Sequence, residues 1–496
     1  MTARSIVERV AGASGLAIVD PTGSWRYEDL DRDARAVAAA LLAGREDLAG
    51  ERVALLAEPG REFVIALLGC WRAGGMAVPL HPPVPDAELS YVLGDAGAGV
   101  IVSSPVHRHR AQGLAPPVSA RVVDLDGLPA ATDALVSPVA AGPDRPALMI
   151  HTSGTTGRPK GVVHTHGSVA AQVDALLAAW AWRPDDRIVL VLPLNHVHGL
   201  VAVVLCALAA GAVCEAPGRF DAADAWSRFA SGDVTLFMAV PTIYTRLVSA
   251  WEQADGPTRE AWSAGARQLR LMVSGSAALP VSTLERWRRL TGHVLLERYG
   301  MTELGMALSN TLEQRHPGHV GWPLPGVETR IVDDAGRDVA EGMPGELLVR
   351  GPNVFREYWR RPDATAAAFV DGGWFRTGDV AVVEPEGYRL LGRSSVDIIK
   401  TGGEKVSALE IEEVYRTHPG VADLAVVGIP DEEWGERVCA AVVPSPGAPE
   451  DGESLRAWGK ERLAPAKVPT RYVLVDALPR NTLGKVLKPK VSQLFE

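Results

Sequence analysis

The chain has 496 residues, of which 47% are hydrophobic and 22% charged, and its formal net charge is −10 at pH 7. This composition is typical of a globular protein of about three domain lengths, and it excludes a disordered, collagen-like or low-complexity chain. The acidic balance argues against nucleic-acid and membrane partners, so any anion site must be built from local positive charge.

The ends and the cysteines indicate the compartment. The N-terminus lacks the apolar core of a signal peptide and carries Glu8 and Asp20, which transit peptides avoid. The longest apolar run, residues 200–214, is shorter than a bilayer span of about 20 residues, and we expect a buried helix that leads into a strand. No metal-ligand or disulfide spacing joins the four cysteines, Cys70, Cys206, Cys214 and Cys439. We therefore expect a cytoplasmic protein.

In the first 320 residues, short apolar runs rich in β-branched residues alternate with alanine-rich amphipathic stretches. The runs predict strands near residues 52–56, 76–80, 99–102, 187–192 and 271–274, and the stretches predict helices near 62–73 and 169–180. This alternation favours stacked α/β layers with largely buried sheets.

The pattern changes after residue 320. Apolar and polar residues alternate over residues 327–332, 345–350 and 388–393, which predicts a small antiparallel β region. A compact α/β unit follows, with a helix near 408–417, strands near 422–428 and 438–443, and a basic tail. The fold class is therefore α/β: a large N-terminal domain over residues 1–393 and a small C-terminal domain over residues 394–496.

A loop rich in hydroxyls and glycine lies between two expected strands, 147–150 and 162–163. Such a loop can wrap a polyphosphate with backbone N–H groups, and a lysine adds positive charge. A Walker loop is excluded, because Arg158 and Pro159 separate the last glycine from the lysine. A solvated turn is the simpler alternative. The candidate residues are Thr152, Ser153, Gly154, Thr155, Thr156, Gly157, Arg158, Pro159 and Lys160.

This loop resembles the phosphate loop of the adenylate-forming superfamily, which contains acyl-CoA synthetases, luciferases and peptide-synthetase adenylation domains. The resemblance covers nearly the whole chain, because further blocks follow in the expected order: YGMTE at 299–303, GE at 345–346 with RG at 350–351, WFRTGD at 374–379, GR at 392–393, and PRNTLGK at 479–485. It implies two steps: a carboxylate attacks ATP to give an acyl adenylate and pyrophosphate, and the thiol of coenzyme A then displaces AMP.

The resemblance also implies the nucleotide contacts. The loop would hold the β- and γ-phosphates, and Glu303 would bind Mg²⁺ with Thr302 nearby, since this hard cation prefers oxygen ligands. In the remaining motifs, Tyr299 and Gly300 would lie at the adenine, Asp379 at the ribose hydroxyls, and Arg393 at the ribose and phosphate.

By the same resemblance, Lys485 would reach from the small domain to the α-phosphate and the attacking carboxylate. A solvated basic tail is its simpler reading, because Lys488 and Lys490 follow. The family rotates this domain between the two steps, so a hinge is expected at Ser395 or Val396, where the chain has one residue more than many members. The segment after the hinge would then face coenzyme A with Lys400, Gly402 and Gly403.

The acid substrate is harder to predict. Arg298 precedes the YGMTE block, where many fatty-acid-activating members have a small or apolar residue, and its planar fork suits a second carboxylate. A structural ion pair with Glu297 or Glu303 is the alternative for Arg298, and a surface position is the alternative for Arg246. Segments that match pocket-lining parts of the family add His196 to the catalytic set and Arg246, His198, Ser276 and Met306 to the acid site.

Within the superfamily, the motifs around Arg298, at 305–309, at 396–403 and at 431–435 are most similar to malonyl-CoA synthetases. This implies malonate as the acid, with methylmalonate as a plausible second substrate. Three alternatives stay open: a short-chain monocarboxylate ligase, an adenylation enzyme that loads a carrier protein, and a relative without activity. We expect no carrier module, since the sequence has none before its end at Glu496.

Overall fold

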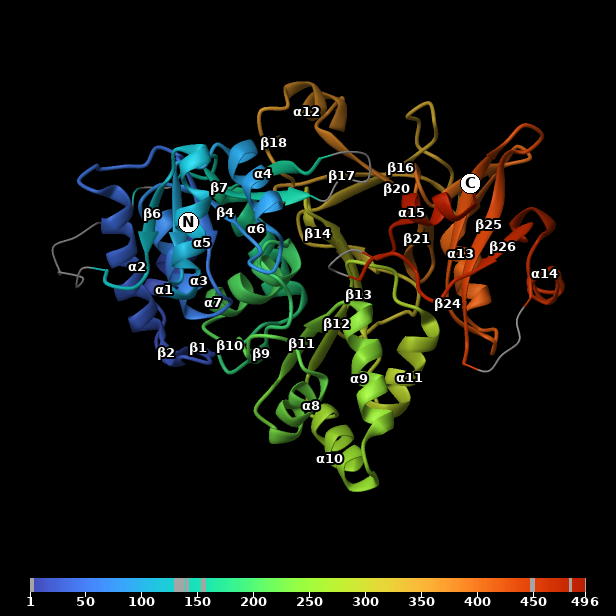
Figure 1. Ribbon diagram of the computed structural model, residues 1–496, viewed down its shortest axis with the longest axis horizontal. Helices are drawn as coiled ribbons and strands as arrows, with labels where there is room; N and C mark the ends of the chain where they lie inside the picture. The colour runs from blue at the N-terminus through green and yellow to red at the C-terminus, as the bar shows by residue number, and fades with distance from the viewer. Residues whose placement is uncertain are drawn as a thin grey trace.

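The computed structural model describes residues 4–128, 139, 142–152, 158–446, 451–480 and 484–495. In these ranges the chain forms four β-sheets with helices packed against them (Figure 1). The α/β fold class and the division into a large body and a small C-terminal domain are confirmed. None of the described helices combines the length and apolar content needed to cross a bilayer.

The seven-stranded sheet carries the phosphate-loop segment. Its strand order is β18-β8-β7-β4-β3-β5-β6, and its central strands pair in parallel. The bounds are β3 Arg52–Leu56, β4 Met76–Pro79, β5 Val100–Ser103, β6 Arg121–Asp124, β7 Pro146–Thr152, β8 Lys160–Thr165 and β18 Glu357–Tyr358.

The nine-stranded sheet has the order β15-β14-β13-β12-β11-β9-β10-β1-β2. Its parallel centre ends in an antiparallel hairpin, β13–β14. The bounds are β1 Leu16–Asp20, β2 Gly23–Arg26, β9 Arg187–Val189, β10 Val213–Glu215, β11 Leu236–Ala239, β12 Leu271–Ser274, β13 Leu296–Met301, β14 Gly305–Ser309 and β15 Trp322–Pro323.

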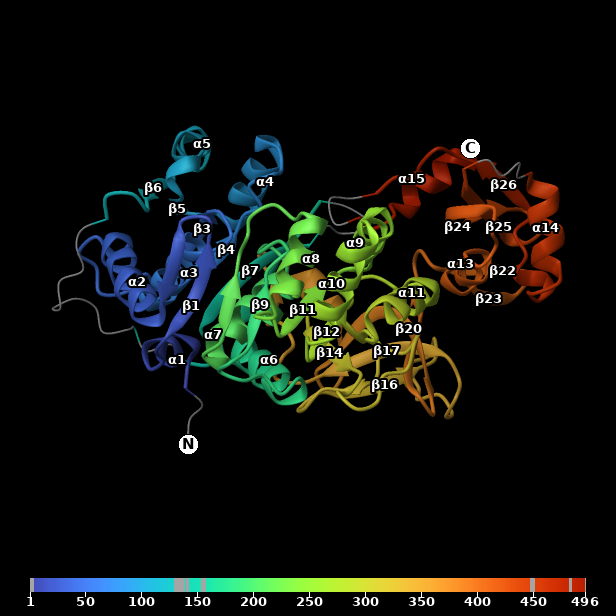
Figure 2. The ribbon, with the colours of Figure 1, turned by 90° about the horizontal axis from the view of Figure 1, so that it is seen from below.

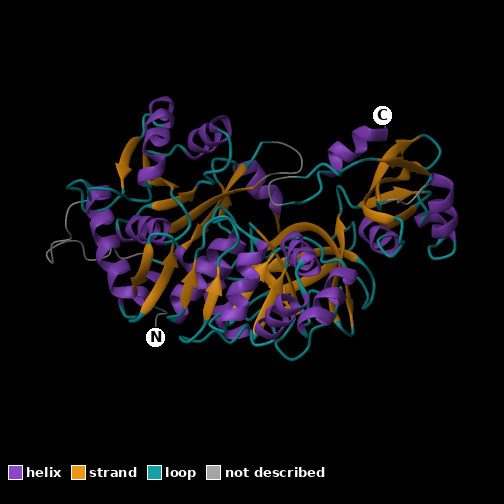
Figure 3. Ribbon diagram, turned by 60° about the horizontal axis from the view of Figure 1, so that its bottom comes forward, coloured by secondary structure: helices purple, strands orange, loops and turns teal. Residues whose placement is uncertain are grey.

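Helices flank both sheets (Figure 3). One apolar core contains residues from both sheets. Helix α2 packs closely on α3 through Gly69, where a Cβ atom would lie 2.6 Å from Cβ of Val37. The helices of the body are α1 Ile6–Ala11, α2 Tyr27–Leu42, α3 Arg61–Arg72, α4 Asp86–Ala96, α5 Arg108–Leu114, α6 His166–Ala179, α7 Cys206–Ala210, α8 Ala222–Ser231, α9 Pro241–Gln253, α10 Gly256–Ala266, α11 Val281–Thr291 and α12 Pro362–Ala368.

The expected elements are found with small differences. The strand expected at 187–192 is shorter, at Arg187–Val189. The apolar run 200–214 is helical and leads into β10 as expected, but its first part, His198–Leu205, is a π-helix. Such helices are rare and often occur at functional sites.

The expected small β region is an antiparallel sheet in the order β16-β17-β20-β19, with β21 paired to β20. The bounds are β16 Glu328–Val332, β17 Gly345–Arg350, β19 Phe369–Val370, β20 Trp374–Glu384 and β21 Gly387–Arg393.

The small C-terminal domain has its own sheet, β23-β22-β25-β24 with β26 on β25, and its own cores. Alternate residues of β24 enter different cores: Leu424 and Val426 one, Ala425 and Val427 the other, as expected for a sheet covered on both faces. The bounds are β22 Ile398–Thr401, β23 Glu404–Ser407, α13 Ala408–Tyr415, β24 Val421–Asp431, β25 Gly435–Pro444, α14 Gly452–Lys460, β26 Arg471–Leu474 and α15 Lys488–Ser492.

The small domain lies beside α9 and α11 of the body (Figure 2). The backbone N–H of Val281, at the start of α11, donates to the carboxylate of Glu413 in α13 at 2.9 Å. A second contact joins Lys405 to Asp334 at 2.6 Å. The two parts therefore touch through polar groups.

Candidate active site

The hairpin β13–β14 carries the centre of the predicted site. Neighbouring residues of a strand point to opposite faces. Arg298 contacts Ser276, whereas Tyr299 contacts Asp379, so one strand serves two groups of residues. Gly300 makes this hairpin possible, because a Cβ atom there would lie 2.0 Å from the carbonyl oxygen of Gly305.

Three of the predicted nucleotide residues form one buried group. The hydroxyl of Tyr299 donates to Oδ2 of Asp379 at 2.6 Å, and Nε of Arg393 donates to Oδ1 at 3.1 Å. Asp379 and Arg393 face each other across β20 and β21. Burial, with the Asp379 charge, raises the pKa of Tyr299 well above its usual value, so the hydroxyl stays a donor.

Glu303 lies in a second group of residues, together with Tyr358. The sequence did not predict a role for Tyr358. The Tyr358 hydroxyl donates to Oε1 of Glu303 at 2.9 Å, and Nζ of Lys160 lies 4.6 Å from the centre of the Tyr358 ring. Burial raises the pKa of Glu303, and the charges of Arg393 and Lys160 oppose this. Glu303, which is the predicted metal ligand, therefore lies close to Lys160 and to Arg393 of the first group.

His164 contacts the backbone next to Glu303, and the sequence did not predict this role either. Its Nε2 bonds the backbone oxygen of Thr302 at 2.7 Å, and its Nδ1 lies 3.2 Å from Oγ of Ser168. Burial lowers the pKa of His164 to about 4, so the ring is neutral at pH 7. It then donates from Nε2, which fixes the backbone at Thr302. A strand histidine has no spacing that marks this role.

The phosphate-loop segment connects β7 and β8, with Thr152 opposite Lys160. The two strands expected on either side of this segment are confirmed. The Tyr91 hydroxyl donates to the carbonyl of Pro159 at 2.8 Å, and the Arg158 guanidinium lies over the Tyr91 ring at 5.6 Å. Five predicted residues lie outside the described ranges: Ser153, Gly154, Thr155, Thr156 and Gly157.

Arg298 is 3% exposed and makes no ion pair among the described residues, so the alternative pairs with Glu297 and Glu303 are absent there. Its Nη2 donates to Oγ of Ser276 at 3.1 Å, and its buried Nε has no partner in the described ranges. A Cβ atom on Gly275 would lie 2.6 Å from Cζ of Arg298, so glycine makes room for the guanidinium.

His198 completes this third group. Its Nδ1 lies 3.3 Å from Oγ of Ser276, and its buried Nε2 has no hydrogen-bond partner in the part of the chain described. Burial, together with the charges of Arg298 and His196, holds the pKa of His198 well below its usual range. Ser276 has a left-handed backbone, with φ of 69°, a strained conformation that is common at functional sites. Unsatisfied buried donors beside a guanidinium suit a carboxylate.

The other predicted acid-site residues lie in different surroundings. Met306 is buried opposite Gly300, and burial lowers the pKa of the half-buried His196 to about 4. Arg246 is exposed on α9, and no described hydrogen bond or ion pair joins it to Arg298 or His198. Hydrogen-bond distances therefore join Arg298, His198 and Ser276 in one group, and Arg246 stays a predicted acid-site residue.

Lys485 is exposed, and its neighbour Val486 pairs with Arg480 in an isolated β-bridge. The carbonyl oxygens of Pro479 and Gly484 accept from Leu487 N–H at 2.8 Å and from Arg480 at 2.6 Å. Gly484 packs against α9: a Cβ atom there would lie 2.8 Å from Cγ2 of Thr242. The predicted lysine is thus next to a residue that contacts the body.

The predicted hinge residues Ser395 and Val396 lie in a turn. The N–H groups of Val396 and Asp397 donate to the carbonyl of Arg393 at 3.1 and 2.8 Å. Beyond it, Gly402 and Gly403 connect β22 and β23, next to Trp434, which is 46% exposed. Lys400, Gly402 and Gly403 are exposed.

Comparison with known proteins identifies the family. Residues 8–359 match the AMP-binding enzyme family, and residues 410–485 match the AMP-binding enzyme C-terminal domain. The chain belongs to the AMP-binding enzyme family. The predicted superfamily resemblance is therefore confirmed.

Within this family, the chain is similar to malonate–CoA ligases. The mitochondrial malonate–CoA ligase ACSF3 of Homo sapiens is 44% identical over 485 residues, which cover 90% of this chain and 84% of the human protein. ATP-bound MatB from Rhodopseudomonas palustris is 35% identical, with a TM-score of 0.89 over 99% of this chain and 98% of that one. A malonyl-CoA ligase with methylmalonyl-CoA and AMP bound is 39% identical, with a TM-score of 0.69 over 95% and 98%.

Proposed function

We propose that this protein joins malonate to coenzyme A, with conversion of ATP to AMP and pyrophosphate through a malonyl adenylate. The choice of malonate as substrate depends on one observation: Arg298 is buried and has no ion pair in the described ranges. A buried guanidinium without a counter-ion is costly, so an anionic partner is expected there. The names of the relatives agree with this substrate.

Recognition of malonate rests on the Arg298 group. Burial lowers the pKa of Arg298 to about 9, which leaves it protonated at pH 7. Its guanidinium would bind the distal carboxylate, with neutral His198 and Ser276 as further partners. The other carboxylate is then free to attack ATP. A methyl branch changes binding by only about 1–3 kcal/mol, so methylmalonate is a second candidate.

The remaining predicted residues would act on the nucleotide. Asp379 and Arg393 would bind the ribose, Tyr299 would contact the adenine, and Lys160 with the loop would bind the phosphates. Lys485 would neutralise charge as one anion approaches another, which is the main barrier to this step.

We propose Mg²⁺ as the metal. The buried carboxylate of Glu303 beside Lys160 offers the oxygen ligand that this cation prefers, and Thr302 offers a second oxygen nearby. When bound, Mg²⁺ would neutralise phosphate charge. Tyr358 holds one oxygen of Glu303 and leaves the other available.

We infer that the small domain, residues 394–496, stands in the orientation for adenylation and moves about a hinge at Ser395 or Val396. The TM-score is 0.89 to ATP-bound MatB but 0.69 to the complex with AMP and methylmalonyl-CoA, although the latter is more similar in sequence. The apolar cores also separate here, with Leu390 on one side and Ile399 on the other. After rotation, Lys400, Gly402 and Gly403 would face coenzyme A.

We further propose a cytoplasmic location, because ATP and coenzyme A are substrates and the four cysteines are free and buried.

The test is pyrophosphate and AMP release with acetate, butyrate, malonate, methylmalonate and succinate, using the wild type and Arg298→Met. We expect malonate to be preferred, and the substitution to reduce its kcat/KM by about 100-fold or more, since a charged hydrogen-bonded pair is lost. Turnover of acetate and butyrate should change little. A wild-type preference for monocarboxylates, or an equal loss for every acid, contradicts the assignment. Turnover that requires an added carrier protein would indicate the carrier-loading alternative.

A further inference from the structure

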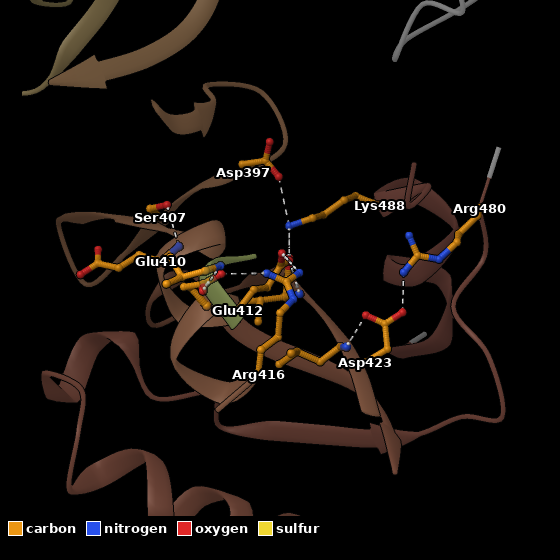
Figure 4. A network of polar contacts seen from close by, with 12 residues as sticks. Asp397, Ser407, Glu410, Glu412, Arg416, Asp423, Arg480 and Lys488 are labelled. Carbon is orange, nitrogen blue, oxygen red and sulfur yellow. Dashed lines mark hydrogen bonds and ion pairs between the residues drawn. The ribbon is translucent and has the colours of Figure 1, made fainter. Parts of the chain in front are cut away.

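The residue Lys488 lies three positions after Lys485 and, unlike it, is buried, with 8% exposed. Its Nζ donates to Oε1 of Glu412 at 2.6 Å and to the carbonyl of Val426 at 2.8 Å, and lies 3.0 Å from Oδ1 of Asp397 (Figure 4). The mechanism proposed above gives this ammonium no role.

The two carboxylates depend on Lys488 to different degrees. Burial alone would lower the pKa of Lys488, but Glu412 and Asp397 more than reverse this, so the amine stays charged. Glu412 also accepts from Val426 N–H at 2.9 Å and pairs with Arg416 at 3.1 Å. Asp397 has no other ion-pair partner in the described ranges. Loss of Lys488 therefore affects Asp397 most.

Asp397 connects Lys488 to the hinge turn. Its Oδ2 accepts from the backbone N–H of Arg393 at 3.0 Å. The Arg393 side chain in turn holds Asp379. One carboxylate thus joins the end of the nucleotide-site strand β21 to the small domain. Rotation about Ser395 or Val396 would have to change this contact.

On its other side, Lys488 follows the segment that carries Lys485. Arg480 donates to Gly484 and pairs with Asp423, and these contacts close the base of that segment on the small domain. Gly484 also lies against α9, where a Cβ atom on it would be 2.8 Å from Cγ2 of Thr242. A shift of Lys488 would therefore reach both the hinge turn and Lys485.

We propose that Lys488 is a positioning residue that ties the segment carrying Lys485 to the hinge turn through Asp397, and so favours the adenylation orientation. This inference rests on the proposed two-step function. It predicts a larger effect on the first step than on the second, because the second step does not need Lys485 in place.

The experiment measures both half-reactions separately. Malonate-dependent pyrophosphate release without coenzyme A reports adenylation, and prepared malonyl adenylate with coenzyme A reports thioester formation. For Lys488→Met we expect adenylation to fall at least about tenfold and thioester formation to change less than about threefold. Lys488→Arg should restore adenylation to within about threefold, since it keeps the charge.

Lys467→Met is the matched control. It removes a lysine that pairs with Glu410 at 2.6 Å in the same domain, with no described hydrogen bond or ion pair to Asp397 or the Lys485 segment. Neither half-reaction should change selectively. Asp397→Ala removes the hinge contact without leaving a buried carboxylate unpaired, and serves if Lys488→Met does not fold. It should show the same selective loss.

Equal loss in both half-reactions, or wild-type adenylation in Asp397→Ala, overturns the positioning role. Failure of the proposed function is distinguishable, because the wild type itself would then release no pyrophosphate with malonate. The double variant Lys488→Met/Asp397→Ala should be no worse than the more impaired single variant, since both act through one contact.

Discussion

At the scale of single residues, this site contains buried ionisable side chains that have no ion pair in the described ranges. Desolvation of a charge costs several kcal/mol unless a partner compensates. Arg298 and Glu297 are neighbours in β13 and both are buried, yet they do not pair. Arg298 bonds Ser276, whereas Glu297 accepts from Gly318 N–H at 2.8 Å. The two side chains thus have different partners, and we expect Arg298 to affect substrate binding and Glu297 to affect stability.

Glu297 should make stability depend on pH. Burial raises the pKa of Glu297 to about 8, and the Glu413 charge adds to this although Gly318 opposes it. The folded state therefore keeps a proton that the unfolded state releases near pH 4.5, so this contribution to stability falls as pH rises toward about 8. In Glu297→Gln the fall should disappear. Relative to the wild type, the free energy of unfolding of the variant, measured in urea, should rise by roughly 1 kcal/mol per pH unit between about pH 6 and 8. If the free energies of unfolding of both proteins changed with pH in the same way, this prediction would be wrong.

Tyr358 should act through Glu303. Tyr358→Phe keeps the ring beside Lys160 and Phe355 but removes the hydroxyl that bonds Glu303. We expect the Mg²⁺ concentration for half-maximal ATP binding, measured by calorimetry, to rise about ten- to a hundredfold, which is the range for losing a hydrogen bond to a metal-binding carboxylate. The affinity for ATP without metal should change little. An unchanged Mg²⁺ dependence would show that the hydroxyl has no part in the metal site.

At the scale of elements, close packing of α2 on α3 fixes part of the body. Gly69→Ala would place a methyl group 2.6 Å from Cβ of Val37, and we expect destabilisation of roughly 1–3 kcal/mol in chemical unfolding. Gly94→Ala in α4 is the control, since nothing lies within 4 Å, and it should stabilise by about 0.5–1 kcal/mol. Similar effects at both positions would mean that helix propensity outweighs packing.

The periodicity of the chain predicted most elements, because buried strands and amphipathic helices leave clear patterns. It could not predict the π-helix at His198–Leu205, since residues buried on every side have no periodicity. Family motifs pointed to Tyr299, Asp379 and Arg393, and the structure brings these together. Tyr358 and His164 could not be found, because their contacts join segments far apart in the chain. The sequence also did not predict that Arg298 is buried and Arg246 exposed.

At the scale of the whole molecule, the proposed two-step function depends on where the small domain lies. In the present orientation Gly484 touches α9 and Glu413 touches α11. Lys405 also pairs with Asp334, and the proposed rotation of the small domain would have to break these contacts. Because the chain has a net charge of −10, the proposed anion sites depend on local positive charge.

Lys485→Ala tests this arrangement. Adenylation should fall by about 100-fold or more, since the charge that meets the attacking carboxylate is lost, whereas thioester formation from prepared malonyl adenylate should stay within about threefold. Rapid-quench measurement of each half-reaction gives both values. Full adenylation by the variant would remove Lys485 from the mechanism.

We propose that Arg298 binds the distal carboxylate of malonate. A crystal structure of the protein with a non-reactive malonyl adenylate analogue tests it most directly. We predict a carboxylate oxygen within about 3 Å of the Arg298 guanidinium, with His198 or Ser276 as a second partner. A distal carboxylate in solvent, with Arg298 still without an anion, would contradict the claim.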